Sequence, residues 1–347
     1  MKTRRSFQQR DGLPDNGFRT FGEFLVAVHR ADAGIEVDAR LVRAATEGDP
    51  TAGGFAVPEV YATRVIGSIY EGAVLAPLCD VTEPSGPIAD YKEPAFDESS
   101  RADGSRWGGA LGYWLAEEKS VPATKPKFRM NEFVPHKLML LAYVTNEMFA
   151  DANMLEAHFE RAMAAEGSFK LDAAIFSGTG AGVPLGILPA PATITVAKET
   201  GQAAASIIKE NIDKMWSRMP LQSRRRAVWL VNEDAEAQIS TADASIYLAQ
   251  GVGGNPYPLL KGRPLLAIEQ ATPLGTLGDI VLADLQQYRV VQGTPQFAVS
   301  ADLAFDTDES VFRFSLRVDG KPAYASAVTP YNGTGITRSP FVTLAAR

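Results

Sequence analysis

The sequence predicts an α+β fold, and three observations carry this prediction. Residues 153–176 place their apolar side chains on one helical stripe. Several short apolar runs in the second half of the chain have the length and composition of buried strands. Residues 297–305 and 311–318 alternate apolar and polar side chains with period two, which indicates an antiparallel hairpin. Helices and antiparallel strands in separate stretches of one chain are typical of the α+β class.

The composition is that of a folding protein without a membrane segment. The 347 residues are 46% hydrophobic and 22% charged, a balance that supplies a core. The most apolar N-terminal stretch, residues 24–28, is far shorter than the ~18 residues that a membrane helix needs. The single cysteine, Cys79, has no internal disulfide partner and is expected to act as a small buried hydrophobe. We therefore expect a soluble chain, made in a reducing cytoplasm, that contacts no membrane.

The charge distribution limits the ways in which nucleic acid could be bound. A net charge of −7 repels nucleic acid from the chain as a whole. One basic cluster stands out at the start, where four cations, Lys2, Arg4, Arg5 and Arg10, precede the first acid. Two interpretations stay open for this cluster: a solvated tail, and an arm that touches DNA or the acidic surface of a partner.

The first 56 residues predict an arm without a core of its own. A short amphipathic helix is expected within residues 18–30, where Phe21 and Phe24 lie on its apolar face. A polar segment with glycine and proline breakers follows up to Gly54. Long irregular segments are rare inside compact domains, so a neighbouring subunit is the expected support. A second short helix is expected over residues 58–76.

A proline-rich segment over residues 80–135 predicts a long projecting β-hairpin. Strand-like pieces at 112–117 and 127–133 flank a turn at 121–123. The segment has no apolar face large enough to fold alone, and an isolated hairpin is marginal in water. Its aromatic side chains therefore need a partner surface.

The remaining elements follow from local patterns. An apolar run at 138–144 precedes the long helix, which is expected to end at Gly178. Ser206 is the expected cap of a helix that ends at Pro220 and buries one face. That face comprises Ile208, Ile212, Met215 and Met219. Strands are expected at 227–231, 265–268, 280–282 and 288–291, with a polar helix starting near Glu233. The C-terminal hairpin is expected to turn at residues 306–309.

No constellation of reactive groups emerges from the sequence. The glycine-rich run at 178–182 follows a helix instead of a strand and lacks the Gly-Lys-Ser/Thr ending of a phosphate loop, so we expect a structural turn. None of the three histidines, His29, His136 and His158, has a second histidine or a cysteine at helical spacing. We therefore expect no catalytic residues, no cofactor and no metal site.

Six motifs follow one another in order between residues 51 and 322. They are 51–58 (TAGGFAVP), 172–188 (DAAIFSGTG with PLGIL), 227–232 (AVWLVN), 260–264 (LKGRP), 278–284 (GDIVLAD) and 317–322 (RVDGKP). Together they resemble the tailed-bacteriophage major capsid protein family, whose subunits have the Hong Kong 97-type capsid fold. The resemblance implies a structural virion protein and not an enzyme.

The resemblance also implies a division of the chain. The parts are an N-terminal arm (1–56), a helix leading into the peripheral domain (57–79), an extended loop (80–135), the peripheral domain with its spine helix (136–195), the axial domain (196–295) and the peripheral-domain return with the C-terminal segment (296–347). The expected assembly contacts are aromatic residues of the loop and the arm: Trp107, Tyr113, Trp114, Phe21 and Phe24.

The function implied is viral capsid assembly. Such a subunit forms a homo-oligomer of hexamers and pentamers, an icosahedral shell that encloses double-stranded DNA and contacts it non-specifically. A portal is an implied partner, and a scaffolding or decoration protein is left open. The implied location is the virion capsid, after synthesis in the host bacterial cytoplasm. Since few residues precede Gly53, no fused scaffolding segment is expected, and the absence of asparagine at 306–309 predicts a shell without covalent crosslinks.

Three alternatives remain at this point. The same fold could form an encapsulin-like nanocompartment or the shell of a gene transfer agent. The third alternative is an α+β enzyme whose site has no recognisable motif, which a deep pocket with mutually hydrogen-bonded ionisable groups would support.

Overall fold

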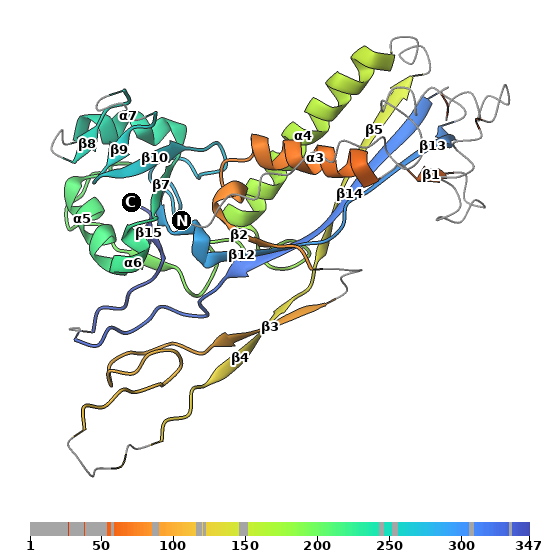
Figure 1. The fold of residues 1–347 in the computed structure, drawn as a ribbon. Coiled ribbons are helices and arrows are strands. Elements are labelled where there is room, and N and C mark those ends of the chain that lie inside the picture. Colours follow the sequence, from red (N-terminus) through yellow and green to blue (C-terminus); the bar gives the residue numbers. More distant parts are fainter. Residues whose placement is uncertain are drawn as a thin grey trace. The chain divides into compact units, whose positions relative to one another are not determined.

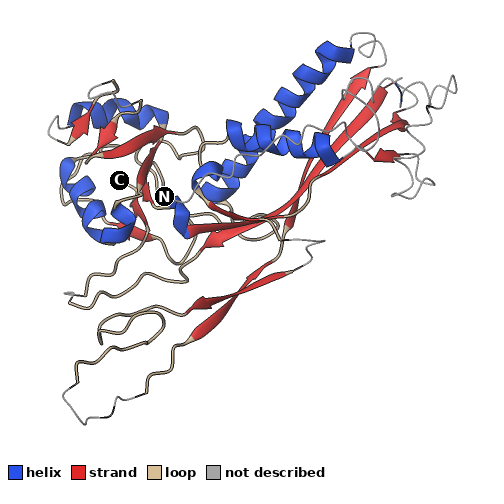
Figure 2. Cartoon of the chain, in the orientation of Figure 1, coloured by secondary structure: helices blue, strands red, loops and turns tan. Residues whose placement is uncertain are grey.

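The computed structural model describes residues 27, 38, 54–56, 59–84, 90–115, 120, 123–145, 152–242, 246–251, 256–304, 309–332 and 335–347. Figures 1 and 2 show helices together with mixed and antiparallel sheets, which confirms the predicted α+β class. The chain divides into two compact units. Unit 1 comprises Met1–Gly72, Leu138–Gly167 and Thr294–Leu316, and unit 2 comprises Ala73–Lys137, Ser168–Gly293 and Arg317–Arg347.

Unit 1 combines helices with strands of an antiparallel sheet. Its strands are β1 (Gly54–Ala56), most of β5 (His136–Thr145), β13 (Gln296–Ala304) and the first part of β14 (Glu309–Pro322). Strand β13 pairs antiparallel with β14, as the alternating pattern at 297–318 predicted, and it also pairs antiparallel with β1, which was not predicted. The turn expected at 306–309 lies outside the described residues except for Glu309.

Two helices in this unit approach closely at a glycine. They are α3 (Glu59–Gly72) and the first part of α4 (Ala152–Ser177), which matches the long helix predicted at 153–176. A Cβ atom on Gly167 of α4 would lie 2.7 Å from Cδ1 of the buried Ile69 on α3. Glycine lowers helix stability by roughly 1 kcal/mol relative to alanine, so the close packing explains its place within α4.

Unit 2 contains a seven-stranded mixed sheet. In spatial order its strands are β6 (Ile194–Val196), β15 (Phe341–Leu344), β11 (Ile280–Ala283), β7 (Val228–Val231), β10 (Arg263–Ala267), β9 (Leu259–Leu260) and β8 (Tyr247–Leu248). Strand β7 pairs antiparallel with β11 and parallel with β10. Every residue of β7, β11 and β15 is buried, which accounts for the continuous apolar runs in β7 and β11.

Three helices belong to the same part of unit 2: α5 (Lys209–Arg218), α6 (Leu221–Arg224) and α7 (Glu233–Ala242). Ile212, Met215 and Met219 are buried, as their spacing predicted. The predicted cap was wrong, because the Ser206 hydroxyl donates to the carbonyl of Ala203 at 2.7 Å and α5 begins only at Lys209. The side chain of Asn211 instead accepts a hydrogen bond from the Ile208 N–H at 3.3 Å.

The centre of this core is an aromatic pair. Trp229 on β7 is fully buried and stacks on Trp216 of α5, with ring centroids 6.4 Å apart and an interplanar angle of 15°. The Trp229 indole donates a hydrogen bond to the carbonyl of Leu260 at 2.9 Å. A buried indole N–H needs such a partner, so this bond fixes the orientation of the ring.

The C-terminal segment is tied to the sheet by a buried ion pair. The side chains of Arg347 and Asp279 are both fully buried, with Nη1 of Arg347 3.2 Å from Oδ1 of Asp279. The second oxygen of Asp279 also accepts the N–H of Gly275 at 2.9 Å. Two charges out of water are tolerated only when they are paired and hydrogen-bonded in this way.

Backbone hydrogen bonds to a buried carboxylate surround the end of α4. Asp172 accepts hydrogen bonds from the N–H groups of Val74, Leu75 and Ala76 at 2.6, 3.1 and 3.1 Å, at the start of the short helix η3 (Ala76–Leu78). Strand β2 (Asp80–Thr82) then pairs in parallel with β12 (Tyr288–Gln292), which follows the short helix η6 (Leu285–Gln287). Strand β12 also pairs antiparallel with the last part of β14.

The glycine-rich stretch after α4 is a structural turn, as predicted. A Cβ atom on Gly178 would lie 2.2 Å from the carbonyl oxygen of Pro184, and one on Gly186 would lie 2.4 Å from the Gly178 nitrogen. The Tyr288 hydroxyl holds the turn by donating to the Leu185 carbonyl at 2.9 Å. The glycines are therefore required by close backbone packing.

Candidate assembly surface

The extended loop of unit 2 contains a two-stranded sheet of its own. Strands β3 (Tyr91–Phe96) and β4 (Phe128–Phe133) pair antiparallel along their whole length. The predicted strand at 127–133 is confirmed, whereas the strand predicted at 112–117 is wrong, because residues 112–115 are irregular and β3 takes that place. Strand β3 was not predicted because it contains Pro94, and prolines are rare in strands. A proline is tolerated here because both edges of a two-stranded sheet are open.

The base of this hairpin is fixed to β14 and to the chain beyond it. The Val134 N–H donates to Oδ2 of Asp319 at 2.8 Å, and Nη2 of Arg129 donates to the carbonyl of Ala323 at 2.5 Å. The ammonium group of Lys321 lies 4.5 Å from the centroid of the buried Phe133 ring, a cation–π contact. These contacts hold the hairpin at one end.

Further from the base, three aromatic rings gather on the hairpin surface. The Phe96 ring centroid lies 5.2 Å from that of Trp107 and 4.9 Å from that of Phe128. All three side chains are nevertheless exposed, Trp107 by 64% and Phe128 by 63%. The neighbouring Met130 is also exposed. Exposed apolar clusters of this kind mark interaction surfaces.

The position of Trp107 depends on an unusual backbone turn. Trp107 itself has φ +53°, in the left-handed region that non-glycine residues rarely occupy. Gly108 follows with φ +76°, and a Cβ atom there would lie 2.4 Å from the carbonyl oxygen of Lys127. The Lys127 N–H donates to the Gly108 carbonyl at 2.8 Å. The turn therefore presents Trp107 at the expense of local strain.

Tyr113 and Trp114 lie in an irregular segment of the same loop. Trp114 is fully exposed, at 103% of its reference area, and Tyr113 is exposed as well. Within the described part of the chain, neither ring pairs with another aromatic ring. The structure thus places the three loop residues predicted from the sequence at the surface, and their role as assembly contacts stays a prediction. Phe21 and Phe24 lie outside the described residues.

The sequence analysis expected the loop aromatics to need a partner surface, but it did not name Phe96 and Phe128 as assembly contacts, and it missed Met130. A sequence signal was present in β4, where the apolar Phe128 and Met130 alternate with the polar Arg129 and Asn131. This signal was not used, because residues 127–133 were predicted to pair with residues 112–117 instead of with β3.

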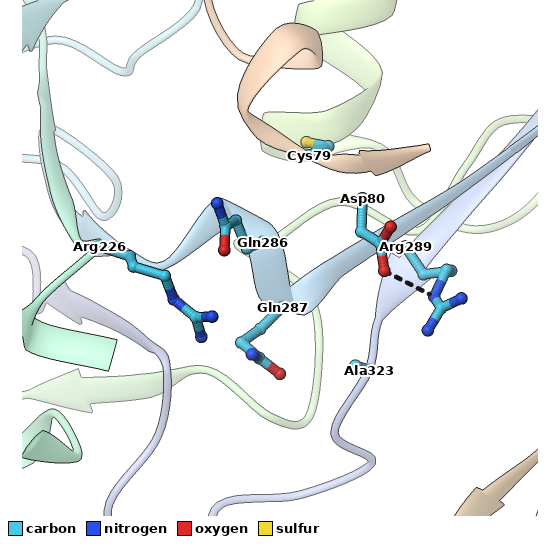
Figure 3. Close-up of a pocket in the computed structure, with 7 residues that line it drawn as sticks. All are labelled: Cys79, Asp80, Arg226, Gln286, Gln287, Arg289 and Ala323. Carbon is cyan, nitrogen blue, oxygen red and sulfur yellow. Dashed lines mark ion pairs between the residues drawn. The ribbon is translucent and has the colours of Figure 1, made fainter. Parts of the chain in front are cut away.

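A polar pocket in unit 2 offers the clearest test for enzymatic chemistry (Figure 3). Its volume is about 450 Å³, and seven residues line it: Cys79, Asp80, Arg226, Gln286, Gln287, Arg289 and Ala323. Arg226 pairs with the buried carboxylate of Asp284 at 2.9 Å. Arg289 pairs with Asp80 at 3.4 Å, the dashed line of Figure 3, and with Glu93 at 3.2 Å.

The pocket has no activated nucleophile. Burial raises the pKa of the Cys79 thiol, and the nearby charges of Asp172 and Asp80 raise it further, so the sulfur stays protonated and unreactive. The arginines that line the pocket are neutralised by carboxylates. In the described ranges, no group of three or more His, Cys, Asp and Glu side chains is arranged to hold a metal ion. No helix in those ranges is long and apolar enough to span a membrane.

The loop presents exposed aromatic side chains and the pocket holds no activated nucleophile, a combination that is typical of a structural subunit that contacts other chains. The sequence model of the phage capsid family matches residues 53–333. The chain therefore belongs to the phage capsid family and is a structural protein of the capsid, not an enzyme. As a capsid subunit it associates with copies of itself.

Solved capsid structures share this fold. The capsid of an empty GTA particle matches with a TM-score of 0.59 and 17% identity, covering 80% of this chain and 90% of that one. Mycobacterium phage Bobi matches with a TM-score of 0.52 and 13% identity, covering 79% and 90%. The procapsid of satellite phage P4 matches with a TM-score of 0.50 and 11% identity, covering 78% and 92%. These likenesses confirm the Hong Kong 97-type fold. A comparison with curated protein sequences finds no significant match.

Proposed function

We propose that the chain is the major subunit of an icosahedral shell, built from hexamers and pentamers, that encloses double-stranded DNA. The observation that carries this proposal is the set of exposed aromatic side chains on the extended loop, Phe96, Trp107, Trp114 and Phe128. A neighbouring subunit that covers these side chains would remove a large apolar area from water.

The hairpin supplies one half of a contact that is suited to ring formation. Closed rings require two different complementary patches on each subunit, since the same patch on both partners would end assembly at a dimer. The hairpin tip and the arm (1–56) are the parts that reach neighbours in this proposal. Trp107, Tyr113 and Trp114 are the loop contacts, and Phe21 and Phe24 are the arm contacts.

The wider proposal concerns cargo, partners and place of assembly. The shell takes up DNA through a portal and touches it without sequence preference, because the net charge of −7 leaves only local patches for phosphate contacts. Subunits are made and assembled in the cytoplasm of a host bacterium. A scaffolding or decoration protein is compatible with the exposed apolar surface.

A gene-transfer-agent shell is the second candidate, and the similarity to GTA capsids favours it over an encapsulin-like compartment. Particles purified from the source cells separate the three possibilities. Nuclease-protected DNA from one phage genome supports the first proposal. Protected fragments drawn from the whole host genome would support the gene transfer agent, and protein cargo without DNA would support the compartment.

A further inference from the structure

Four arginines gather at the corner between α5 and α6, a feature unrelated to the hairpin. Arg218 ends α5, Arg224 ends α6, Arg225 follows it, and Arg338 comes from the segment that precedes β15. Nη1 of Arg218 donates to the Thr337 carbonyl at 3.3 Å, and the Ser339 N–H donates to the Arg218 carbonyl at 3.1 Å. These two bonds bring the segment of Arg338 against the end of α5.

The cluster is built on the core of unit 2. The Arg224 guanidinium lies 5.4 Å from the centroid of Trp216, which itself stacks on Trp229. Its Nε also donates to the Met219 carbonyl at 3.0 Å. Arg224 is therefore held in place by an aromatic face and by the backbone carbonyls of Met219 and Ser217, and no carboxylate of the described residues forms an ion pair with it.

The positive charge of this cluster is not neutralised within the described chain. Burial lowers the pKa of Arg224, and the positive charge of the nearby Arg338 lowers it further. Arg225 and Arg338 are exposed, and no ion pair among the described residues includes either of them. Of the run 224–226, only Arg226 has a carboxylate partner, Asp284. Like charges held together without a counter-ion favour the approach of an anionic partner.

The surroundings favour a protein over nucleic acid as that partner. Leu221, on the same short helix as Arg224, is 70% exposed, and Ile336 beside Arg338 is 43% exposed. Arginine and aromatic side chains with apolar neighbours are typical of protein interfaces. Exposed leucine and isoleucine side chains gain nothing from a phosphate backbone.

An anionic counterpart is present on the chain itself. The first turn of α7 carries three acids, Glu233, Asp234 and Glu236, and the first two are exposed. In Figure 1, α6 lies near the bottom and α7 near the top of this part of unit 2, well apart from each other. A basic patch and an acidic patch at separate places on one unit allow head-to-tail contacts that close into a ring.

We infer that the arginine cluster of Arg218, Arg224, Arg225 and Arg338 docks against the acidic first turn of α7 on the next copy of this chain. Each copy thus offers its basic patch to one neighbour and its acidic patch to the other. This inference rests on the proposed function and names a contact between the subunits of one ring.

Charge exchange tests the contact. Arg225→Glu with Arg338→Glu, and separately Glu233→Arg with Asp234→Arg, should each raise the subunit concentration needed for assembly at least about tenfold, because each change replaces attraction by repulsion. The variant that carries all four changes should assemble again near the wild-type concentration. Lys198→Glu is the matched control for Arg225→Glu, since Lys198 is an exposed cation on unit 2 outside the cluster.

Assembly is measured by sedimentation velocity and electron microscopy, and thermal melts check that each subunit folds. Normal assembly of both double variants, or a four-change variant that stays as defective as the doubles, would overturn the contact. Normal assembly with loss of binding to duplex DNA would overturn it in favour of a nucleic-acid site. A wild-type chain that forms no rings or shells would instead overturn the proposed function, and this contact with it.

Discussion

Replacement of Trp114 by alanine separates assembly from folding. Trp114 is 103% exposed in the single subunit, so its removal deletes no packed contact of the described chain. Surface substitutions of this kind usually change the free energy of unfolding by less than about 0.5 kcal/mol. We therefore expect the unfolding midpoint of the unassembled Trp114→Ala subunit to match that of the wild type.

The effect on assembly is expected to be much larger. A tryptophan that becomes buried at an interface removes about 150–250 Å² from water, which corresponds to about 4–6 kcal/mol at ~25 cal/mol per Å². Ordering of the loop offsets part of this gain. If half remains, the concentration of subunit needed for shell formation rises roughly a hundredfold, which sedimentation across a concentration series measures.

Trp229→Ala is the matched control because the same side chain is removed from a fully buried position. It also deletes the stack on Trp216 and the hydrogen bond to Leu260. A loss of about 3–5 kcal/mol in unfolding free energy is expected, measured by urea denaturation. The reasoning is refuted if Trp114→Ala unfolds the subunit, or if it assembles at wild-type concentration.

Three further predictions concern single contacts. Arg347→Ala leaves the buried Asp279 without its partner and should lower the free energy of unfolding by about 3–5 kcal/mol, measured by urea denaturation. The control is Arg313→Ala, which removes an exposed arginine and should change that free energy little. Gly108→Ala forces a Cβ against the Lys127 carbonyl at positive φ and should destabilise the loop turn by about 1–3 kcal/mol. Faster hydrogen exchange at the Lys127 amide would reveal this, whereas Gly112→Ala, with open space around it, should leave that rate unchanged. Denaturing gels of mature particles should show one monomer band, because residues 306–309 contain no asparagine to accept a loop lysine, and the hydrogen bond from Lys92 to Glu132 in addition raises the pKa of Lys92; a ladder that survives boiling would contradict this.

Local patterns in the sequence were sufficient for elements whose residues carry their own signal. The apolar spacing in α4 and α5 and the uninterrupted apolar runs of β7 and β11 predicted these elements to within a few residues. Hydrophobic burial is decided by neighbours one turn or two residues away, so a short window of sequence contains the information.

Features that depend on distant parts of the chain were not predictable in this way. Strand β15 is four residues long, and it pairs with β11 and β6 far away in the sequence. The arginine cluster likewise depends on Arg338 lying near Arg224, although more than a hundred residues separate the two in the sequence. Trp107 and Trp114 were identified because the loop has no apolar face large enough to fold alone, whereas the pairing of Phe96 with Phe128 was not predicted because strand β3 was not recognised.

Electron microscopy of the purified full-length chain tests the central claim most directly. Concentrated subunits should form closed icosahedral shells in which hexamers and pentamers are resolved, and the hairpin of each subunit should lie against a neighbour with Trp107 and Trp114 covered. A chain that remains a folded monomer at every concentration, alone and with the other capsid components of its source, would contradict the account. So would shells in which both tryptophans stay in contact with solvent.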